Sequence, residues 1–370
     1  MNQLNNLRDG RIEQPVEYLL RPIKFGDHAA KNRIFFAPLT RCRAVGHVPN
    51  ELMREYYTQR ASAGLLITEC TMVTPKTSAF AHEPGIFSEE QVAGWRKITD
   101  SVHEQNGLIF CQIWHAGRAA HPALNDGAEC VAPSAIAIDG EAHTPEGKLA
   151  YTMPRAMSVD EIKATVQAFK QAALQAKAAG FDGVEVHGAN GYLIDQFLRD
   201  GTNQRTDEYG GSVENRCRFL FEILEAVCEV MGSGSVGLRL SPINGFNDIK
   251  DSDPVDLSTY LALALNDFNL AYTHIIRGDQ TGQTEADIVK PFSDHYEGAL
   301  ILNMGYDADT GAREIENGTG DAISYGRHFL ANPDLPERFK QDAKLNEPNP
   351  DTFYTQGSEG YTDYPALDER

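Results

Sequence analysis

The sequence predicts an α/β fold in which eight parallel strands, each followed by a helix, close into a (β/α)8 barrel of the TIM type. Short apolar runs of strand type alternate with longer segments of helical periodicity, and the alternation recurs eight times. The 370 residues exceed a typical single domain, but no linker rich in Ser, Gly or Pro divides them. Eight such units close naturally into one barrel.

The amino-terminal half supplies four strands and three helices. Ser88 with Gln91, and Ser158 with Glu161, have the spacing of capping boxes, which marks the starts of two helices. Gly180 ends the second of these helices. The predicted strands cover residues 33–39, 64–73, 108–114 and 181–187, and the predicted helices cover residues 52–63, 88–105 and 158–179.

The carboxy-terminal half repeats the same pattern. The predicted strands cover residues 236–240, 272–276, 300–303 and 321–325, and the predicted helices cover residues 213–231, 255–266 and 285–292. Because the composition shows no sharp break, we expect residues 18–370 to form one barrel domain. Residues 1–17 are polar and are expected to form an N-terminal extension.

One segment interrupts the alternation between the third strand and its helix. Residues 116–155 contain many Pro, Gly, Ala and His residues and form an extended loop. In a barrel, a connection that follows a strand lies over the active face. Its position favours a lid or capping subdomain, and the alternative is a surface insertion without a role.

The charge of the chain restricts its partners. There are 53 acidic and 33 basic residues, which give a formal net charge of −20. Such a surface repels phosphate backbones and anionic membranes, so we expect neither nucleic acid nor membrane as a partner. No apolar run approaches the ~20 residues that span a bilayer. An anionic ligand must therefore find local positive charge or backbone N–H groups.

The cysteines and the N-terminus indicate a cytoplasmic protein. The six cysteines include no C-x-x-C pair, so the sequence predicts reduced thiols and no zinc, iron–sulfur or other metal site. Residues 1–17 lack the hydrophobic segment of a secretory signal.

The most informative motif is HGANGY at residues 187–192, which directly follows a strand of buried type. His187 and Asn190 can both present N–H donors, and two convergent donors can polarise a carbonyl or nitro oxygen. Tyr192 offers a phenol that can donate a proton in a dry site. The alternative is a core histidine with a satisfied hydrogen bond.

Polar side chains also lie in two other strands. Gln112 alternates with Trp114 on one strand face, where an amide can bridge to a heterocycle and an indole can wall a pocket. Arg239 lies inside an apolar strand, which costs energy unless the charge is paired. Its partner is either the anionic edge of a cofactor or a carboxylate from a neighbouring strand.

Glycines and an arginine follow the last two strands. Met304 and Gly305 follow the seventh strand, and Gly326 and Arg327 follow the eighth. Many barrels bind phosphate at this place through loop N–H groups. Simple turn glycines are the alternative.

These blocks, taken in order, resemble the old yellow enzyme family of FMN-dependent ene-reductases, in its classical branch. The resemblance extends from about residue 18 to about residue 364. The most specific blocks are NRIFFAPLTR at 32–41, GLLITE at 64–69, QIWHAGR at 112–118, GFDGVEVHGANGYLIDQFL at 180–198, EYGGSVENR at 208–216 and EGYTDYP at 359–365.

The resemblance implies FMN bound without a covalent bond over the barrel mouth, with NADPH or NADH as reductant. Gln112 and Arg239 would bind the pyrimidine end of the flavin, and Thr40 would bond near its O4. The implied ring edge is Ala37, Pro38 and Leu39 with Cys70, and the implied phosphate site is Met304, Gly305, Gly326 and Arg327. Cys70 and Met304 depart from the family, in which Ala or Gly and Gly are usual at these two positions.

The resemblance also implies reduction of the C=C bond of α,β-unsaturated carbonyl or nitro compounds by a ping-pong mechanism. His187 and Asn190 would bind the electron-withdrawing group, flavin N5 would give hydride, and Tyr192 would give the proton. The implied pocket walls are Phe80, which departs from a common tyrosine, with Trp114 and Tyr354.

Several alternatives accompany this expectation. The chain is expected to act on small-molecule activated alkenes as a monomer or homodimer. A reductase of nitroaromatics, nitrate esters or quinones stays open, as does a non-catalytic phosphate-binding barrel. A hydroxy-acid oxidase or dihydroorotate dehydrogenase is disfavoured, because the tyrosine stands where those enzymes need a base.

Overall fold

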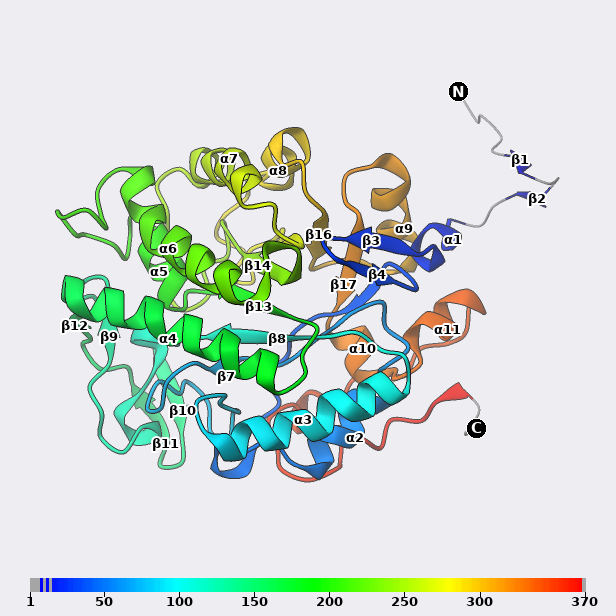
Figure 1. Cartoon of the computed structure of the whole chain (residues 1–370), viewed down its shortest axis with the longest axis horizontal. Helices are drawn as coiled ribbons and strands as arrows, with labels where there is room; N and C mark the ends of the chain where they lie inside the picture. Colours follow the sequence, from blue (N-terminus) through cyan, green and yellow to red (C-terminus); the bar gives the residue numbers. More distant parts are fainter. Residues whose placement is uncertain (1–6, 9–10, 13–14, 368–370) are drawn as a thin grey trace.

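A closed barrel of eight parallel strands forms the centre of the protein (Figure 1). The computed structural model describes residues 7–8, 11–12 and 15–367. The barrel strands are β5 (Ile34–Phe36), β6 (Leu66–Ile67) continued by β7 (Thr71–Met72), β8 (Ile109–Trp114), β13 (Gly183–Gly188), β14 (Val236–Leu240), β15 (Tyr272–Ile276), β16 (Leu300–Asn303) and β17 (Ala322–Tyr325). Neighbouring strands pair in parallel, and β13 pairs with β8 to close the ring. The predicted (β/α)8 barrel is confirmed.

Helices surround the barrel (Figure 1). Both predicted capping boxes are present, at Ser88 with Gln91 and at Ser158 with Glu161. The helices are α1 (Glu17–Leu20), α2 (Glu51–Gln59), α3 (Glu89–Glu104), α4 (Val159–Ala178), α5 (Leu193–Leu198), α6 (Val213–Met231), α7 (Pro254–Ala264), α8 (Val289–His295), α9 (Ala308–Asn317), α10 (Arg327–Ala331) and α11 (Leu335–Lys340).

The second predicted strand is interrupted, so the prediction of one continuous strand over residues 64–73 is wrong. Side-chain hydroxyls take part in the ladder between β6 and β7. The Gln112 N–H donates to Thr68 Oγ1 at 3.0 Å, and Thr71 Oγ1 donates to the Glu69 carbonyl at 3.0 Å. Because one hydroxyl accepts in place of a backbone carbonyl and the other donates in place of a backbone N–H, the regular strand geometry breaks at residues 68–70.

Two predicted helices have different bounds. The helix predicted over residues 285–292 begins only at Val289. Asp287 Oδ1 accepts from the Lys290 N–H at 3.1 Å, and this contact places the helix start after Asp287. The helix predicted over residues 52–63 ends at Gln59. The sequence pattern predicts no bounds for helices α1, α5, α9, α10 and α11.

An N-terminal hairpin closes the floor of the barrel, a feature absent from the sequence prediction. Strands β3 (Ile23–Phe25) and β4 (His28–Ala30) are antiparallel. The Phe25 ring centroid lies 5.5 Å from that of Phe35, 6.0 Å from that of Tyr272 and 6.2 Å from that of Phe110. This apolar layer seals the end of the barrel opposite to the carboxyl ends of its strands.

The extended loop after the third barrel strand is present. Its strands β9 (Val131–Ala132) and β12 (Arg155–Ala156) pair in parallel, and β10 (Glu141–Thr144) and β11 (Gly147–Ala150) form a hairpin. The buried guanidinium of Arg118 donates to the carbonyls of Ile136, Asn247 and Asp248 at 3.1, 2.9 and 2.7 Å. These bonds connect the insertion to the loop after β14. Its role as a lid stays a prediction.

All six cysteines are free thiols, as predicted. Strands β1 (Leu7–Arg8) and β2 (Arg11–Ile12) form an antiparallel pair, whereas much of the predicted extension lies outside the described residues. The division of the chain at residue 17 therefore stays a prediction. Within the ranges that the structure describes, none of the helices has the length and apolar character needed to traverse a bilayer.

We predict that Gly26→Ala destabilises the protein by disturbing the β3–β4 hairpin that closes the barrel floor. Gly26 has φ = 50°, and a Cβ there would lie 2.1 Å from the Gly234 carbonyl oxygen. Left-handed strain and a backbone clash together should cost about 2 kcal/mol or more. Gly318→Ala is the matched control, because its φ is 73° but no atom lies within 4 Å of the added Cβ. Thermal unfolding should show the larger drop for Gly26→Ala, and equal midpoints would contradict the packing of the hairpin.

Candidate active site

Three aromatic side chains meet where strands β8 and β13 end. Trp114 ends β8, His187 lies one residue before the end of β13, and Tyr192 directly precedes α5. The Tyr192 ring centroid lies 4.4 Å from that of Trp114 and 5.3 Å from that of His187. All three side chains are buried. The fold therefore brings the predicted imidazole and phenol together at the carboxyl ends of the barrel strands.

Asn190 lies in the turn between β13 and α5 with a left-handed backbone, at φ = 59°. Its N–H donates to Ser241 Oγ at 2.7 Å, and its carbonyl accepts from Asn247 Nδ2 at 2.9 Å. Asn244 Nδ2 donates to Asn190 Oδ1 at 2.9 Å. Because its oxygen is held by Asn244, the Asn190 amide can offer its Nδ2 donor to a ligand.

Burial sets the protonation states of the two titratable groups. Burial, with a further contribution from Arg239 and His274, lowers the pKa of His187 well below its ordinary value, so the imidazole is neutral at pH 7. Burial raises the pKa of Tyr192 well above its ordinary value of 10.0, and nearby acidic groups raise it further. The site therefore combines a neutral imidazole with a protonated phenol.

A hydrogen-bonded network inside the barrel supports these residues. Glu185 on β13 accepts from Gln112 Nε2 at 2.7 Å, from His274 Nδ1 at 2.9 Å and from the Tyr272 hydroxyl at 3.1 Å. The Cys70 thiol in turn donates to Gln112 Oε1 at 3.2 Å. Burial alone would raise the pKa of Glu185, but His274, Arg239 and Gln112 together lower it. The network therefore holds a carboxylate and orients the Gln112 amide.

Arg239 projects from β14 beside this network, and it is the register partner of His187 on β13. Its Nη2 donates to Asn303 Oδ1 at 2.9 Å, and the residue is 6% exposed. In the described part of the chain, no carboxylate lies within 4.0 Å of its nitrogens. Glu185 acts on it only through space. A carboxylate on a neighbouring strand is thus near Arg239, but it makes no direct contact.

Three buried polar atoms of the site have no partner among the described residues. They are His187 Nδ1, Trp114 Nε1 and Arg239 Nε. An unsatisfied buried polar group costs about 1–3 kcal/mol, so three of them at one mouth indicate a polar ligand. A heterocycle with carbonyl oxygens, ring nitrogens and negative charge, such as reduced FMN, fits this donor set.

The residues predicted for the flavin edge follow β5. The Ala37 N–H donates to the Tyr325 carbonyl at 3.2 Å, which holds this segment beside β17. A Cβ at Gly326 would have only Leu39 Cδ2 nearby, at 3.5 Å, so backbone faces open space there. The predicted set is Ala37 and Pro38, which are buried, and Leu39 and Thr40, which are half-buried.

The four residues predicted for phosphate lie at two adjacent strand ends. Met304 and Gly305 follow β16 with left-handed backbones, at φ = 81° and 77°. Arg277 donates to both of their carbonyls, at 2.9 and 3.2 Å. Because a trans peptide directs its N–H opposite to its carbonyl, the N–H groups of residues 305 and 306 point away from Arg277. Gly326 and the exposed Arg327 follow the neighbouring strand β17.

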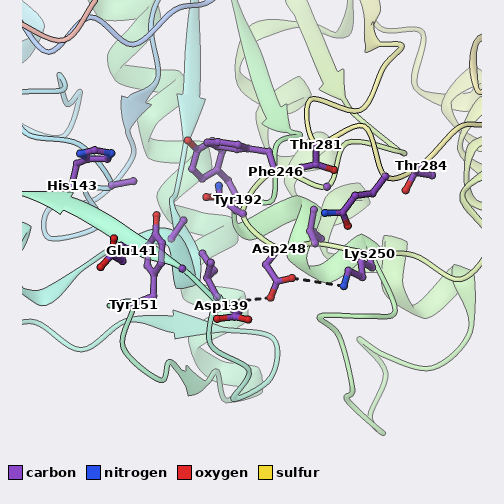
Figure 2. Close-up of a pocket in the computed structure, with 18 of the residues that line it drawn as sticks. Asp139, Glu141, His143, Tyr151, Tyr192, Phe246, Asp248, Lys250, Thr281 and Thr284 are labelled. Carbon is purple, nitrogen blue, oxygen red and sulfur yellow. Dashed lines mark hydrogen bonds and ion pairs between the residues drawn. The ribbon is translucent and has the colours of Figure 1, made fainter. Parts of the chain in front are cut away.

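A cavity of about 630 Å³ extends outward from Tyr192 and Phe80 (Figure 2). Its outer walls are the insertion, near residues 138–151, and the loops at 245–250 and 281–284. The Phe80 ring stacks on Tyr354, with centroids 5.9 Å apart and an angle of 15° between the rings. Tyr354 is 59% exposed, so this pair lies at the rim of the site.

Buried arginines hold the C-terminal segment that carries Tyr354. Arg41 Nε donates to the Phe353 carbonyl at 3.0 Å, and its Nη2 donates to the Gly360 carbonyl at 2.7 Å. Arg43 Nη2 donates to the Thr352 carbonyl at 3.0 Å. Arg41 and Arg43 directly follow the predicted flavin-edge residues. Their hydrogen bonds therefore connect the C-terminal segment at the rim to the barrel.

Sequence reasoning missed several residues that shape the site. Glu185 and His274 each lie inside an apolar strand, the same signal that identified Arg239, and could have been found in the same way. Asn244, which orients Asn190, lies in a loop without a distinctive motif. Only the tertiary structure brings it to Asn190.

Comparison with known proteins assigns the chain to a family. A model of the NADH:flavin oxidoreductase / NADH oxidase family matches residues 18–346. A probable flavin mononucleotide-dependent alkene reductase of Leishmania infantum is 49% identical over 362 residues, which are 95% of this chain and 98% of the relative. The 12-oxophytodienoate reductase 1 of Oryza sativa subsp. japonica is 43% identical over 358 residues, 95% of this chain and 93% of that one.

Solved structures agree with this assignment. The old yellow enzyme from Trypanosoma cruzi is 41% identical with a TM-score of 0.93, over 96% of this chain and 100% of that one. Morphinone reductase in complex with tetrahydroNAD is 43% identical with a TM-score of 0.90, over 95% of this chain and 98% of that one. The chain therefore belongs to the NADH:flavin oxidoreductase / NADH oxidase family and is a flavin oxidoreductase of the old yellow enzyme type.

Proposed function

We propose that this enzyme uses NADPH or NADH to reduce the C=C bond of α,β-unsaturated carbonyl or nitro compounds, in two half-reactions at one site. The observation that carries the proposal is the proximity of the His187 and Tyr192 rings at one barrel mouth, with 5.3 Å between their centroids and Asn190 in the turn that follows β13. Relatives named as alkene and 12-oxophytodienoate reductases support a C=C substrate.

His187 and Asn190 bind the electron-withdrawing group of the substrate. The neutral imidazole and the Asn190 amide each offer an N–H donor to a carbonyl or nitro oxygen. Because negative charge grows on that oxygen as hydride reaches the β-carbon, these bonds strengthen in the transition state. Trp114, Phe80 and Tyr354 form the walls that exclude water from the alkene.

Tyr192 donates the proton to the α-carbon. Its phenol is 5% exposed, and burial keeps its pKa well above 10.0, so the proton is present throughout the physiological pH range. Such a weak acid protonates only a strongly basic atom. Proton transfer is therefore confined to the α-carbon after electron density has reached it.

The cofactor site would hold FMN through three groups of residues. Bound FMN supplies hydride chemistry at N5 of its ring. Gln112 and Arg239 would bind the pyrimidine end, where the guanidinium, which is hydrogen-bonded to the neutral Asn303 side chain, would offset negative charge. Ala37, Pro38, Leu39, Thr40 and Cys70 would contact the ring edge, and Met304, Gly305, Gly326 and Arg327 would bind the phosphate through N–H groups and the arginine fork.

The nicotinamide reductant would use the same mouth. A complex of morphinone reductase with tetrahydroNAD supports a nicotinamide ligand in this family. Since one mouth serves both reactants, the oxidised nicotinamide leaves before the alkene binds, which is ping-pong order. We propose that the enzyme works in the cytoplasm as a monomer or homodimer.

We predict that the two half-reactions separate in the Tyr192→Phe variant. Loading of hydride from NADH needs no proton from Tyr192, whereas alkene reduction does. Stopped-flow absorbance should show wild-type flavin bleached by NADH and reoxidised by 2-cyclohexenone without oxygen. The variant should bleach normally but reoxidise about 100-fold or more slowly. Tyr260→Phe, on α7, should change neither rate, and an equal loss in both half-reactions would contradict the assignment.

The raised pKa of Tyr192 predicts the pH profile of alkene reduction. A group whose folded pKa is raised keeps its proton above its ordinary pKa, so the acid should persist to about pH 10. The rate of the alkene half-reaction should not fall between about pH 7 and about pH 10. A decline with a midpoint near pH 9, while the flavin spectrum stays unchanged, would exclude the phenol as a buried acid.

Removal of either donor should weaken anionic ligands. His187→Ala and Asn190→Ala each delete one charge-assisted hydrogen bond, worth about 1.5–3 kcal/mol or roughly 10–100-fold in Kd. Titration with p-hydroxybenzaldehyde, followed by its charge-transfer absorbance, measures this loss. His295→Ala and Asn317→Ala change exposed residues of α8 and α9 and should leave Kd unchanged. An unaltered Kd in the first two variants would remove the donor pair from the site.

A further inference from the structure

We propose that the outer cavity binds the adenosine end of the nicotinamide cosubstrate, and that its carboxylates make the enzyme prefer NADH to NADPH. This inference rests on the proposed function, because it needs the nicotinamide to react at the barrel mouth. It goes further by assigning a selectivity to residues that take no part in the chemistry. The residues concerned are Asp139, Glu141 and Asp248.

The cavity is continuous with the reaction site. Tyr192 and Phe80 line its inner end, and the β10 strand with the loop at 245–250 line its outer end. The barrel floor is closed by the N-terminal hairpin, so a long ligand with one end at Tyr192 must extend outward. A volume of about 630 Å³ is in the range of small-molecule sites. The part of the cosubstrate distal to its nicotinamide therefore meets these outer walls.

The outer walls carry more negative than positive charge. Asp139, Glu141 and Asp248 line the cavity and are exposed; Figure 2 shows Asp139 beside Asp248, with Glu141 next to Tyr151. Asp248 Oδ2 accepts from the Asp139 N–H at 3.3 Å, which holds the two residues together. Lys250 is the one lysine of this lining, and its Nζ lies 3.9 Å from Asp248 Oδ1. Its charge is therefore already partly neutralised.

A fourth carboxylate stands behind the wall. Asp279 accepts from the N–H groups of Gly245, Thr281 and Thr284, at 2.8, 2.9 and 2.9 Å. Burial alone would raise its pKa, but these hydrogen bonds lower the pKa of Asp279 to about 2. Asp279 is thus ionised at any working pH, and it fixes the two loops that line the cavity together with Asp139 and Glu141.

Neutral hydrogen-bonding groups occupy the opposite wall. Thr281, Gln283 and Thr284 line the cavity and are exposed. Hydroxyl and amide groups suit the 2′- and 3′-hydroxyls of a ribose, which need both donors and acceptors. A 2′-phosphate instead needs cationic donors, which are the arginine or lysine groups that bind phosphate elsewhere. This wall offers hydrogen bonds without positive charge.

NADH and NADPH differ only at the 2′ position of the adenosine ribose. The 2′-phosphate of NADPH adds about −1.5 to −2 charges at pH 7. Three carboxylates and one lysine give the cavity lining a net charge of −2. Together with the net charge of −20 on the whole chain, this charge repels the 2′-phosphate over distances comparable with the Debye length of ~8 Å in physiological salt. We expect NADPH to bind roughly tenfold or more weakly than NADH at low ionic strength, with a smaller ratio at high salt.

The experiment measures binding without turnover. Isothermal titration of the FMN-loaded enzyme with tetrahydro-NADH and tetrahydro-NADPH, which cannot transfer hydride, gives the ratio of the two dissociation constants. The Asp139→Lys/Glu141→Lys variant should reduce this ratio from about tenfold to near one, mainly by tighter binding of tetrahydro-NADPH. Glu146→Lys is the control, since it places a lysine in the turn of the same hairpin but outside the cavity lining. It adds two charges where the double variant adds four, so the two effects are compared per unit of added charge.

A second, neutral variant tests the inference even if the double lysine variant does not fold. Asp139→Asn/Glu141→Gln should shift the ratio in the same direction by a smaller factor, with an unchanged flavin spectrum. Equal affinities in the wild type, or a ratio that responds no more to the cavity variants than to Glu146→Lys, would overturn the inference. If neither NADH nor NADPH bleaches the bound flavin, both the proposed function and this inference are wrong. If both bleach the flavin and bind with equal affinity, only the cosubstrate preference is wrong.

Discussion

One buried carboxylate, that of Glu185, holds together the strands that carry the site. It joins β13 to β8 through Gln112 and to β15 through Tyr272 and His274, and His274 Nε2 continues the chain to Ser324 on β17 at 2.7 Å. A lone charge in this interior would be too costly, so the carboxylate persists only because three donors and a nearby arginine compensate it. The site therefore stands on a rigid polar layer inside an otherwise apolar barrel.

The same layer explains the charge states above it. Arg239 is balanced by Glu185 through space, and its guanidinium donates to the neutral side chain of Asn303. That cation, together with burial, keeps His187 neutral. Burial also raises the pKa of Tyr192, so two neutral groups, an imidazole and a phenol, lie near the buried Arg239 cation.

The inner and outer parts of the site carry charges of opposite sign. The inner mouth combines a cation with unsatisfied buried polar atoms, which suits electron-rich ligands. The outer cavity is bounded by carboxylates from an insertion and from a separate loop, which Arg118 connects through backbone carbonyls. Because the proposed charge selectivity lies in the outer part, it can vary without disturbing the chemistry of the inner part.

Much of the architecture followed from the sequence alone. Alternating apolar runs and capping boxes determined the eight-stranded barrel, because such local patterns depend on near neighbours. HGANGY and the buried Arg239 indicated which residues gather at the mouth. The interruption of the second strand at Thr68, the floor hairpin and the orientation of Asn190 by Asn244 were decided by the tertiary structure. Each depends on partners that lie far apart along the chain, and no periodicity reports contacts that form only when the barrel closes.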